Sequence, residues 1–280
     1  MFTKRTKKFM AILLMICMVF AFTGCTKKTS QADEEKVEAQ PQTKLEKIKA
    51  SGKLVLGTAA DYPPYEFHKV INGKDEIVGF DIEIAKEIAK DLGVELEIKD
   101  MKFDGLLAAL VADKIDIIIA GMVPTEEREK SVDFTKQYYQ AEQGLLIRAE
   151  DADKLNTTDA FKGLVVGAQK STIQEEIAVN QIPGAEPKLL SKITDLVLEL
   201  TNKKVDGVVL VSPVAKAYAE SNPALKVADI SFGAEEGIAA AVNKGNEDFL
   251  EAVNKTLDKL MSEGAIDKFI EEATKLSEQE

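Results

Sequence analysis

The sequence predicts an α/β protein with two similar lobes, a hinge and a ligand cleft between the lobes. Short apolar strands alternate with amphipathic helical stretches from residue 45 onward, which is typical of α/β folds. The pattern of residues 114–120 returns at residues 204–210. Polar or glycine-containing segments follow the strands, where open α/β sheets bind their ligands.

Composition narrows the function. The 280 residues are enough to bury a sizeable core. The net charge of −12 argues against nucleic acid as a partner, because phosphate binding needs a basic face. Two cysteines and one histidine, His68, argue against a disulfide framework, a Cys- or His-based metal site and a His-based catalytic triad. We expect no metal and no cofactor.

The N-terminus has the pattern of an export signal. Basic residues from Lys4 to Lys8 precede an unbroken apolar run at residues 9–22, which is shorter than the roughly 20 residues that span a bilayer. This predicts a signal peptide at residues 1–24. Its end, Phe-Thr-Gly-Cys at Cys25, resembles the lipobox of bacterial lipoproteins. The alternative is an ordinary secretory signal followed by a chance cysteine.

A tether follows the signal. Residues 26–44 are almost entirely polar and contain little to bury, so we expect a flexible segment. With Cys25 lipidated, residues 25–44 would hold a folded body just outside a membrane.

The first lobe begins with a buried strand at residues 54–57. A helix is predicted at residues 81–92, with Asp81 as its N-cap and Gly93 as its stop. Another helix begins at Asp104, and an apolar strand is predicted at residues 115–120. Apolar strands between helices favour a mostly parallel sheet.

The second lobe repeats this order. A strand is predicted at residues 164–167, a helix at 194–201 and a strand at 207–210. Asp206 precedes its strand as Asp116 precedes the strand of the first lobe. The polar segment at residues 148–158 is interpreted as the passage between lobes, and two lobes of this kind can close like a hinge.

A candidate anion-binding residue follows the strand that ends at Ala120. Gly121 permits a close backbone approach, Thr125 is a good N-cap, and Arg128 falls in the first turn of the helix that follows. A guanidinium can grip a carboxylate with two parallel hydrogen bonds. The alternative is a solvated arginine paired with a neighbouring glutamate.

The corresponding junction of the second lobe carries Ser171 and Thr172. Either would cap the next helix, whose first N–H groups and dipole favour an anion. The alternative is a structural cap without a ligand. In the first lobe, Tyr62 and Phe103 lie at strand-to-helix junctions, where aromatic rings can flank a small ligand.

These motifs closely resemble the polar amino-acid solute-binding proteins of ABC importers, the family 3 extracellular solute-binding proteins. The resemblance rests on residues 57–67, 78–82, 103–107, 120–128, 131–134 and 138–139, and it covers about residues 45–275. It implies a fold like that of the type II periplasmic-binding proteins. The first lobe would comprise residues 45–144 plus 237–280, and the second would comprise residues 145–236.

The resemblance also implies a site. Arg128 would hold the α-carboxylate of the ligand, with Ser171 and Thr172 at the opposing helix N-terminus. Tyr62 and Phe103 would flank the ligand's side chain. The remaining positions of the implied ligand-binding set are Ala120, Gly121 (whose carbonyl would meet the amino group), Met122, Gln169 and Val211.

Two positions depart from the family pattern. Val123 stands where the family usually has Ser or Thr, and Val211 stands where it usually has the acid that binds the ligand's α-amino group. A buried ammonium without an acceptor is costly. Either another acid serves, with Glu235 and Glu236 as candidates, or the ligand is a carboxylate without that amino group.

We therefore expect a monomeric, non-enzymatic, extracytoplasmic binding protein. It would be anchored to the membrane by Cys25 and would deliver an amino acid or related carboxylate to an ABC permease. One alternative is a ligand sensor without transport. Another is a dehydratase-type enzyme, which would need an acid and a base in the cleft, whereas His68 lies in a polar stretch that we interpret as a surface turn.

Overall fold

The structure is a computed structural model that describes residues 42–234 and 236–278. The expected signal, Cys25 and most of the tether lie outside these residues. Helix α1 (Lys44–Ser51) begins after Thr43, which forms a capping box with Glu46. The last residues of the expected tether therefore belong to ordered structure. Across the described part of the chain, no helix is both long and apolar enough to cross a membrane.

The first sheet has five strands in the order β5-β1-β6-β13-β7. Strand β1 runs parallel to β5 and β6, whereas β13 runs antiparallel to β6 and β7. The strands are β1 (Lys53–Thr58), β5 (Glu95–Asp100), β6 (Ile117–Ile118), β7 (Val132–Phe134) and β13 (Ala241–Asn243). Together with the helices that pack on it, this sheet is called the first lobe below.

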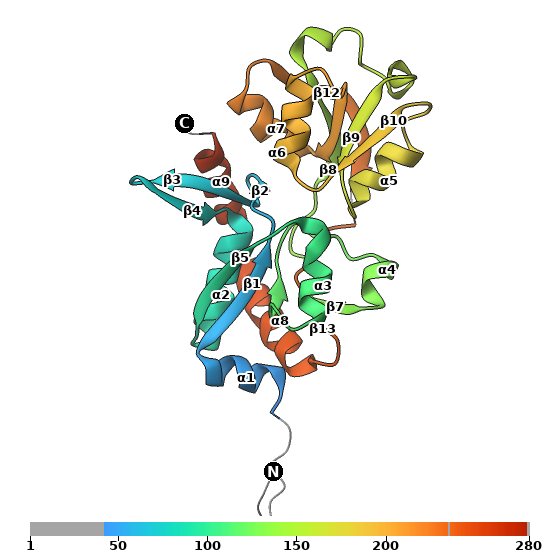
Figure 1. Cartoon of the computed structure of the whole chain (residues 1–280). Helices are drawn as coiled ribbons and strands as arrows, with labels where there is room; N and C mark the ends of the chain where they lie inside the picture. Colours follow the sequence, from blue (N-terminus) through green and yellow to red (C-terminus); the bar gives the residue numbers. More distant parts are fainter. Residues whose placement is uncertain (1–41, 235, 279–280) are drawn as a thin grey trace, which may run out of the picture. The chain divides into compact units, whose positions relative to one another are not determined.

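Helices from distant parts of the chain cover the first sheet. The two C-terminal helices pack against α2, and all three form one cluster with α1 (Figure 1). A 3₁₀ turn at Phe103–Gly105 precedes α3, so the helix expected at Asp104 begins slightly later than predicted. The helices are α2 (Phe80–Leu92), α3 (Leu106–Val111), α4 (Glu126–Glu129), α8 (Glu247–Ser262) and α9 (Ala265–Ser277).

A small antiparallel sheet, in the order β2-β3-β4, extends from the first lobe. Its strands are β2 (Asp61–Tyr62), β3 (Glu66–Ile71) and β4 (Lys74–Val78). His68 lies on β3 rather than in a turn, and its ring contacts Asp75 at 2.9 Å and Asp100 at 3.4 Å. The prediction of a surface turn at His68 was therefore wrong, although the residue is exposed.

The second sheet repeats the design of the first, in the order β10-β9-β11-β8-β12. Strand β9 is parallel to β10 and β11, and β8 is antiparallel to β11 and β12. Both sheets are therefore mixed rather than mostly parallel. The strands are β8 (Glu142–Arg148), β9 (Val165–Gln169), β10 (Glu186–Leu190), β11 (Gly207–Val211) and β12 (Leu225–Ala234).

Three helices pack on the second sheet and complete what is called the second lobe below. They are α5 (Ile173–Asn180), α6 (Ile193–Thr201) and α7 (Ser212–Ser221), and two 3₁₀ turns lie at Ala149–Asp151 and Thr158–Phe161. The two-lobed α/β fold predicted from the sequence is confirmed by this topology.

The chain passes between the sheets twice. It leaves the first sheet at Phe134 and enters the second at Glu142, then leaves β12 at Ala234 and returns at Ala241. An isolated bridge between Tyr139 and Ile238 joins the two passages. We predicted that residues 148–158 are the passage between lobes. This prediction was wrong, because β8, which ends at Arg148, already belongs to the second sheet. The expected boundary at residues 144/145 falls inside β8.

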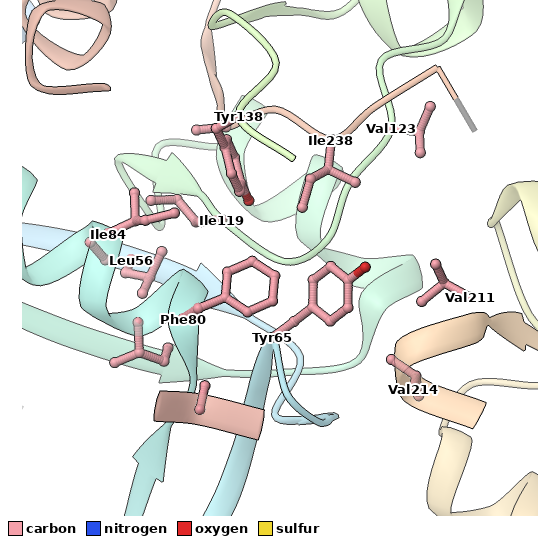
Figure 2. Packing of buried hydrophobic residues seen from close by; sticks show 14 of the residues in the cluster. Leu56, Tyr65, Phe80, Ile84, Ile119, Val123, Tyr138, Val211, Val214 and Ile238 are labelled. Carbon is pink, nitrogen blue, oxygen red and sulfur yellow. The ribbon is translucent and has the colours of Figure 1, made fainter. Parts of the chain in front are cut away.

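Asp81 does not cap its helix. The N-cap of α2 is Gly79, and Asp81 lies fully buried inside the first turn. Its carboxyl accepts hydrogen bonds from Gly121 N at 2.8 Å and from the Tyr138 hydroxyl at 2.8 Å. Beside it, the Tyr65 ring packs on Phe80 with centroids 4.5 Å apart (Figure 2). A local capping rule missed a residue whose partners come from elsewhere in the fold.

Candidate functional site

One pocket is lined by side chains of both lobes. Its cavity volume is about 20 Å³, which is room for about one water molecule, so its walls lie close together. It lies where strands end and helices begin, as expected for α/β sheets. The lining residues are Ala59, Asp61, Tyr62, Glu66, Phe103, Ala120, Gly121, Val123, Arg128, Gln169, Thr172, Ile173 and Gln174.

Arg128 is the cation of this pocket. Thr125 caps α4 as predicted, and its hydroxyl accepts from Arg128 N. The guanidinium is buried, lies 5.4 Å from the centre of the Phe103 ring, and donates to the carbonyls of Val123 at 2.5 Å and Ser171 at 2.7 Å. Burial lowers the pKa of Arg128 to about 10, so the side chain remains charged at neutral pH. The alternative of a solvated arginine is excluded by this burial.

The N-terminus of α5 reaches the same pocket. Thr172 is the N-cap, and its hydroxyl accepts from Glu175 N and donates to the Gln169 carbonyl at 2.6 Å. Ser171 has a left-handed backbone with φ of 63°, and its N–H donates to the Glu175 carboxylate at 2.7 Å. Ser171 is exposed and lines a neighbouring pocket that also includes Arg128.

Aromatic side chains and a glycine shape the first-lobe wall. Tyr62 and Phe103 both line the pocket, and Gln174 of the second lobe donates to the Tyr62 hydroxyl at 3.4 Å. Gly121 has φ of 54°, and a Cβ there would lie 3.3 Å from both the Tyr62 and Tyr65 rings. A side chain at position 121 would therefore be strained and would crowd this wall.

Asp61 contributes a carboxylate and also bridges the lobes. Its Oδ2 accepts from Ile193 N, at the start of α6, at 2.7 Å, and its backbone carbonyl accepts from the Tyr218 hydroxyl at 2.8 Å. Its Oδ1 is buried and has no hydrogen-bond partner among the described residues. Burial raises the pKa of Asp61 to about 6, against the lowering effect of the Ile193 N–H.

Glu66 is a second acid in the pocket. It is 1% exposed, and its Oε2 has no hydrogen-bond partner in the described part of the chain. Sequence reasoning missed both acids, although they flank the Tyr-Pro-Pro-Tyr segment that it singled out. The signal that could have indicated these site residues is the presence of an acid on each side of a rigid aromatic turn.

Three of the predicted site residues do not line this pocket. Met122 and Val211 are each 1% exposed and pack in the apolar core, and Ser171 lies in the neighbouring pocket. The pocket does bring together Tyr62, Phe103, Ala120, Gly121, Arg128, Gln169 and Thr172. Ala59, Asp61, Glu66, Val123, Ile173 and Gln174 line it without having been predicted.

One of the two acids proposed to replace the missing one at Val211 does not line the pocket. Glu236 is exposed, and Glu235 lies outside the described residues. Among the residues that the structure describes, no cluster of three or more His, Cys, Asp or Glu side chains could hold a metal ion. The pocket therefore offers a buried guanidinium, two carboxyls and aromatic walls, which together suit a small ligand that carries both charges.

Comparison with known proteins agrees with this geometry. Residues 54–274 match the bacterial extracellular solute-binding proteins, family 3. The arginine-binding extracellular protein ArtP of Bacillus subtilis is 34% identical, covering 94% of this chain and 96% of the relative. A probable histidine-binding protein of Campylobacter jejuni is 35% identical over 78% of this chain and 83% of its own length.

A solved structure shows the same fold. The amino-acid ABC transporter substrate-binding protein AbpA of Streptococcus pneumoniae, bound to L-arginine, superposes with a TM-score of 0.81. It is 40% identical and is matched over 84% of this chain and 100% of its own. The family match covers most of the chain, in the order of motifs that the sequence predicted. The chain therefore belongs to the family 3 bacterial extracellular solute-binding proteins.

Proposed function

We propose that this protein captures an amino acid with a cationic side chain, arginine being the first candidate, for an ABC importer. The observation that carries the proposal is the charge content of the pocket. Arg128 supplies one buried guanidinium, and Asp61 and Glu66 supply two carboxyls. The hydrogen bonds from Arg128 end on carbonyls rather than on these acids, so both kinds of charge remain available to a ligand.

Each charge has a defined task in this proposal. The Arg128 guanidinium holds the α-carboxylate in a bidentate pair, which is stronger than a neutral hydrogen bond. The carboxyls of Asp61 and Glu66 receive the cationic end, and Tyr62 and Phe103 flank the aliphatic part. The arginine-binding relatives support this assignment.

Val211 leaves the α-amino group without the usual acid. Val211 is buried at the N-cap position of α7 and pairs with Gln143 of β8, whose side chain accepts from Gln174 of the pocket wall. We propose that amide and carbonyl oxygens accept from the ammonium in this protein. This pairing is weaker than one with an acid, and the two acids at the ligand's cationic side chain would offset the loss.

Hinge closure and anchoring complete the proposal. The lobes would be residues 44–134 plus 241–278 and residues 142–234, with a hinge at the passages 135–141 and 236–240. The bridge between Tyr139 and Ile238 supports this hinge. Lipidation of Cys25 would keep the protein beside its permease; it is supported by the sequence pattern alone, because Cys25 lies outside the described residues. We propose binding without turnover, with the aromatic rings, Arg128 and the two acids of the pocket serving to hold the ligand.

Thermal unfolding of the full chain, freed of ligand by unfolding and refolding, tests the ligand class. The panel is L-arginine, L-citrulline (no cation), agmatine (no carboxylate) and 5-guanidinopentanoate (no α-amino group). A ligand at about 100 times its Kd adds about 2.7 kcal/mol, which is a shift of roughly 5–10 °C for a chain of this size.

We expect a large shift with L-arginine and much smaller shifts with L-citrulline and agmatine. A shift with 5-guanidinopentanoate that equals the shift with L-arginine would mean that the α-amino group is not recognised. Equal shifts with L-citrulline and L-arginine would reject the cationic ligand. NMR of the recovered ligand should show it unchanged, and a product would reveal an enzyme.

A further inference from the structure

Glu66 has an unusual position for an acid. It begins β3, lines the pocket and is 1% exposed, yet its Oε2 has no hydrogen-bond partner among the described residues. An ionised carboxylate in such a place would be costly. The side chain is therefore built either to hold a proton or to meet a cation from the pocket.

A second buried carboxyl lies behind it. Asp81 is fully buried and accepts from Gly121 N and the Tyr138 hydroxyl, each at 2.8 Å. The buried carboxyls of Glu66 and Asp81 are neighbours that act on each other. Two ionised carboxylates have only acceptors, so a hydrogen bond between these two groups would need a proton.

The surroundings favour that proton. Burial and the neighbouring acids raise the pKa of Glu66 well above its usual range, and burial raises the pKa of Asp81 to about 7. Asp61 from β2 and Asp100 from β5 act on Glu66, and the Tyr138 hydroxyl donates to Asp81. Arg128 lines the same pocket as Glu66, and its guanidinium donates to carbonyls.

We propose that the cationic group of the bound solute replaces the proton held between Glu66 and Asp81, so that binding releases a proton. This rests on the proposed function, because it takes the ligand to be cationic. The pair then acts as a specificity device. A guanidinium or ammonium can neutralise the ionised pair, whereas a neutral amide of the same shape leaves the proton in place.

The sign of the pH dependence follows. The empty protein binds more protons than the loaded protein, so affinity for a cation falls as pH falls below the pKa of the pair. The limit is about tenfold per pH unit for one proton. The affinity for a neutral analogue should not follow this trend, because no proton leaves the site.

Calorimetry of the full chain measures the proton directly. L-arginine is titrated at pH 7 in buffers of small and large ionisation enthalpy, such as phosphate and Tris, and the difference in heat gives the protons released. The ligand's guanidinium stays protonated throughout, and L-citrulline carries the same α-ammonium group, so a release seen with L-arginine alone comes from the protein. We expect between about half and one proton with L-arginine, and nearly none with L-citrulline if it binds.

Two variants locate the source. Glu66→Gln keeps the shape and supplies an N–H to Asp81, so it should abolish most of the release and weaken L-arginine far more than L-citrulline. Asp61→Asn is the matched control, because it changes an acid of the same pocket that is already held by Ile193 N. It should weaken L-arginine while the release persists.

The outcomes are distinct. L-arginine binding without proton release, or a release lost in Asp61→Asn but kept in Glu66→Gln, overturns this inference and leaves the proposed function standing. Failure of L-arginine, L-lysine and L-ornithine alike to bind at any pH overturns both. The affinity of Glu66→Gln for L-arginine is also measured against pH. If it falls at low pH as steeply as that of the wild type, the assignment of the proton to this pair is rejected.

Discussion

Arg128 and Arg148 are equally buried, at 7% and 8% exposure, but they have different partners. Arg148, at the end of β8, donates to Asp151 at 2.7 Å and Asp206 at 2.8 Å, and to the carbonyls of Leu200 and Val205. Arg128 donates to carbonyls alone. The difference in partners, rather than burial, distinguishes the structural Arg148 from Arg128, for which we propose an anion-binding role.

The Arg148 network has a counterpart in the first lobe. Asp206 accepts from Val165 N at 3.0 Å, and Asp116 accepts from Val55 N at 2.9 Å. Lys44 lies 2.7 Å from Asp116, where Arg148 lies 2.8 Å from Asp206. Each lobe thus joins neighbouring strands through an aspartate and a cation. Arg128 has no such equivalent, which agrees with a role outside the fold.

The largest expected effect comes from Arg128→Ala. Loss of two charge-assisted hydrogen bonds, worth about 1.5–3 kcal/mol each, should weaken L-arginine roughly 10²- to 10⁴-fold. The Tm of the ligand-free protein should stay the same or rise, because a buried charge without a counter-ion is removed. Calorimetry and thermal unfolding check both parts.

Arg128→Lys is the control for that experiment. It keeps the charge but loses the planar fork, so its affinity should fall between the wild type and Arg128→Ala. If Arg128→Ala binds L-arginine like the wild type, Arg128 is not the residue that holds the ligand's carboxylate.

Arg148→Met should have the opposite signature. It leaves two partly buried carboxylates without their cation, and breaking such a pair costs up to about 3–5 kcal/mol. We expect a fall in Tm of roughly 6 °C or more for a chain of this size, with the Kd for L-arginine nearly unchanged. Unchanged stability together with lost binding would reverse the assignment.

The sequence was sufficient for the fold because the fold is repeated. The apolar strands with Asp116 and Asp206 before them predicted two similar lobes, and the two aspartates make the same hydrogen bond in each. The passages between sheets were harder to predict. Polarity favoured residues 148–158, but Arg148 is fixed by Val205 and Asp206, which lie far away in the sequence and which no local pattern reveals.

The site was predicted where a local rule and the tertiary structure agree. Thr125 and Thr172 cap their helices as expected and bring Arg128 and Gln169 to the pocket. The rules failed where side chains turn toward the core. Met122 follows the left-handed Gly121, which directs it inward, and Asp81 has a capping residue's identity but buried tertiary partners.

Asp116→Ala and Asp206→Ala sharpen the comparison of the lobes at a smaller scale. Each removes the acceptor of a strand N–H, which costs about 1–3 kcal/mol when the group is buried. Both variants remove an anion from a cation, but Asp206→Ala should be the worse of the two, because Arg148 is buried whereas Lys44 is half-buried and keeps Asp113. Urea unfolding measures the stability of both variants. A larger loss of stability in Asp116→Ala than in Asp206→Ala would contradict this comparison of the two aspartates.

The smallest effect is expected at a third kind of cation, which stands in solvent. Lys136 contacts Asp258 at 2.5 Å, but the two side chains are 54% and 52% exposed. Exposed pairs contribute about 0–1 kcal/mol and are screened by salt. Lys136→Met should therefore lower the free energy of unfolding by no more than about 1 kcal/mol, and the loss should vanish in high salt. The loss in Arg148→Met should persist in high salt, because Asp151 and Asp206 are partly shielded from the ions of the solvent. Urea unfolding of both variants at two salt concentrations therefore separates a buried network from an exposed ion pair of similar length.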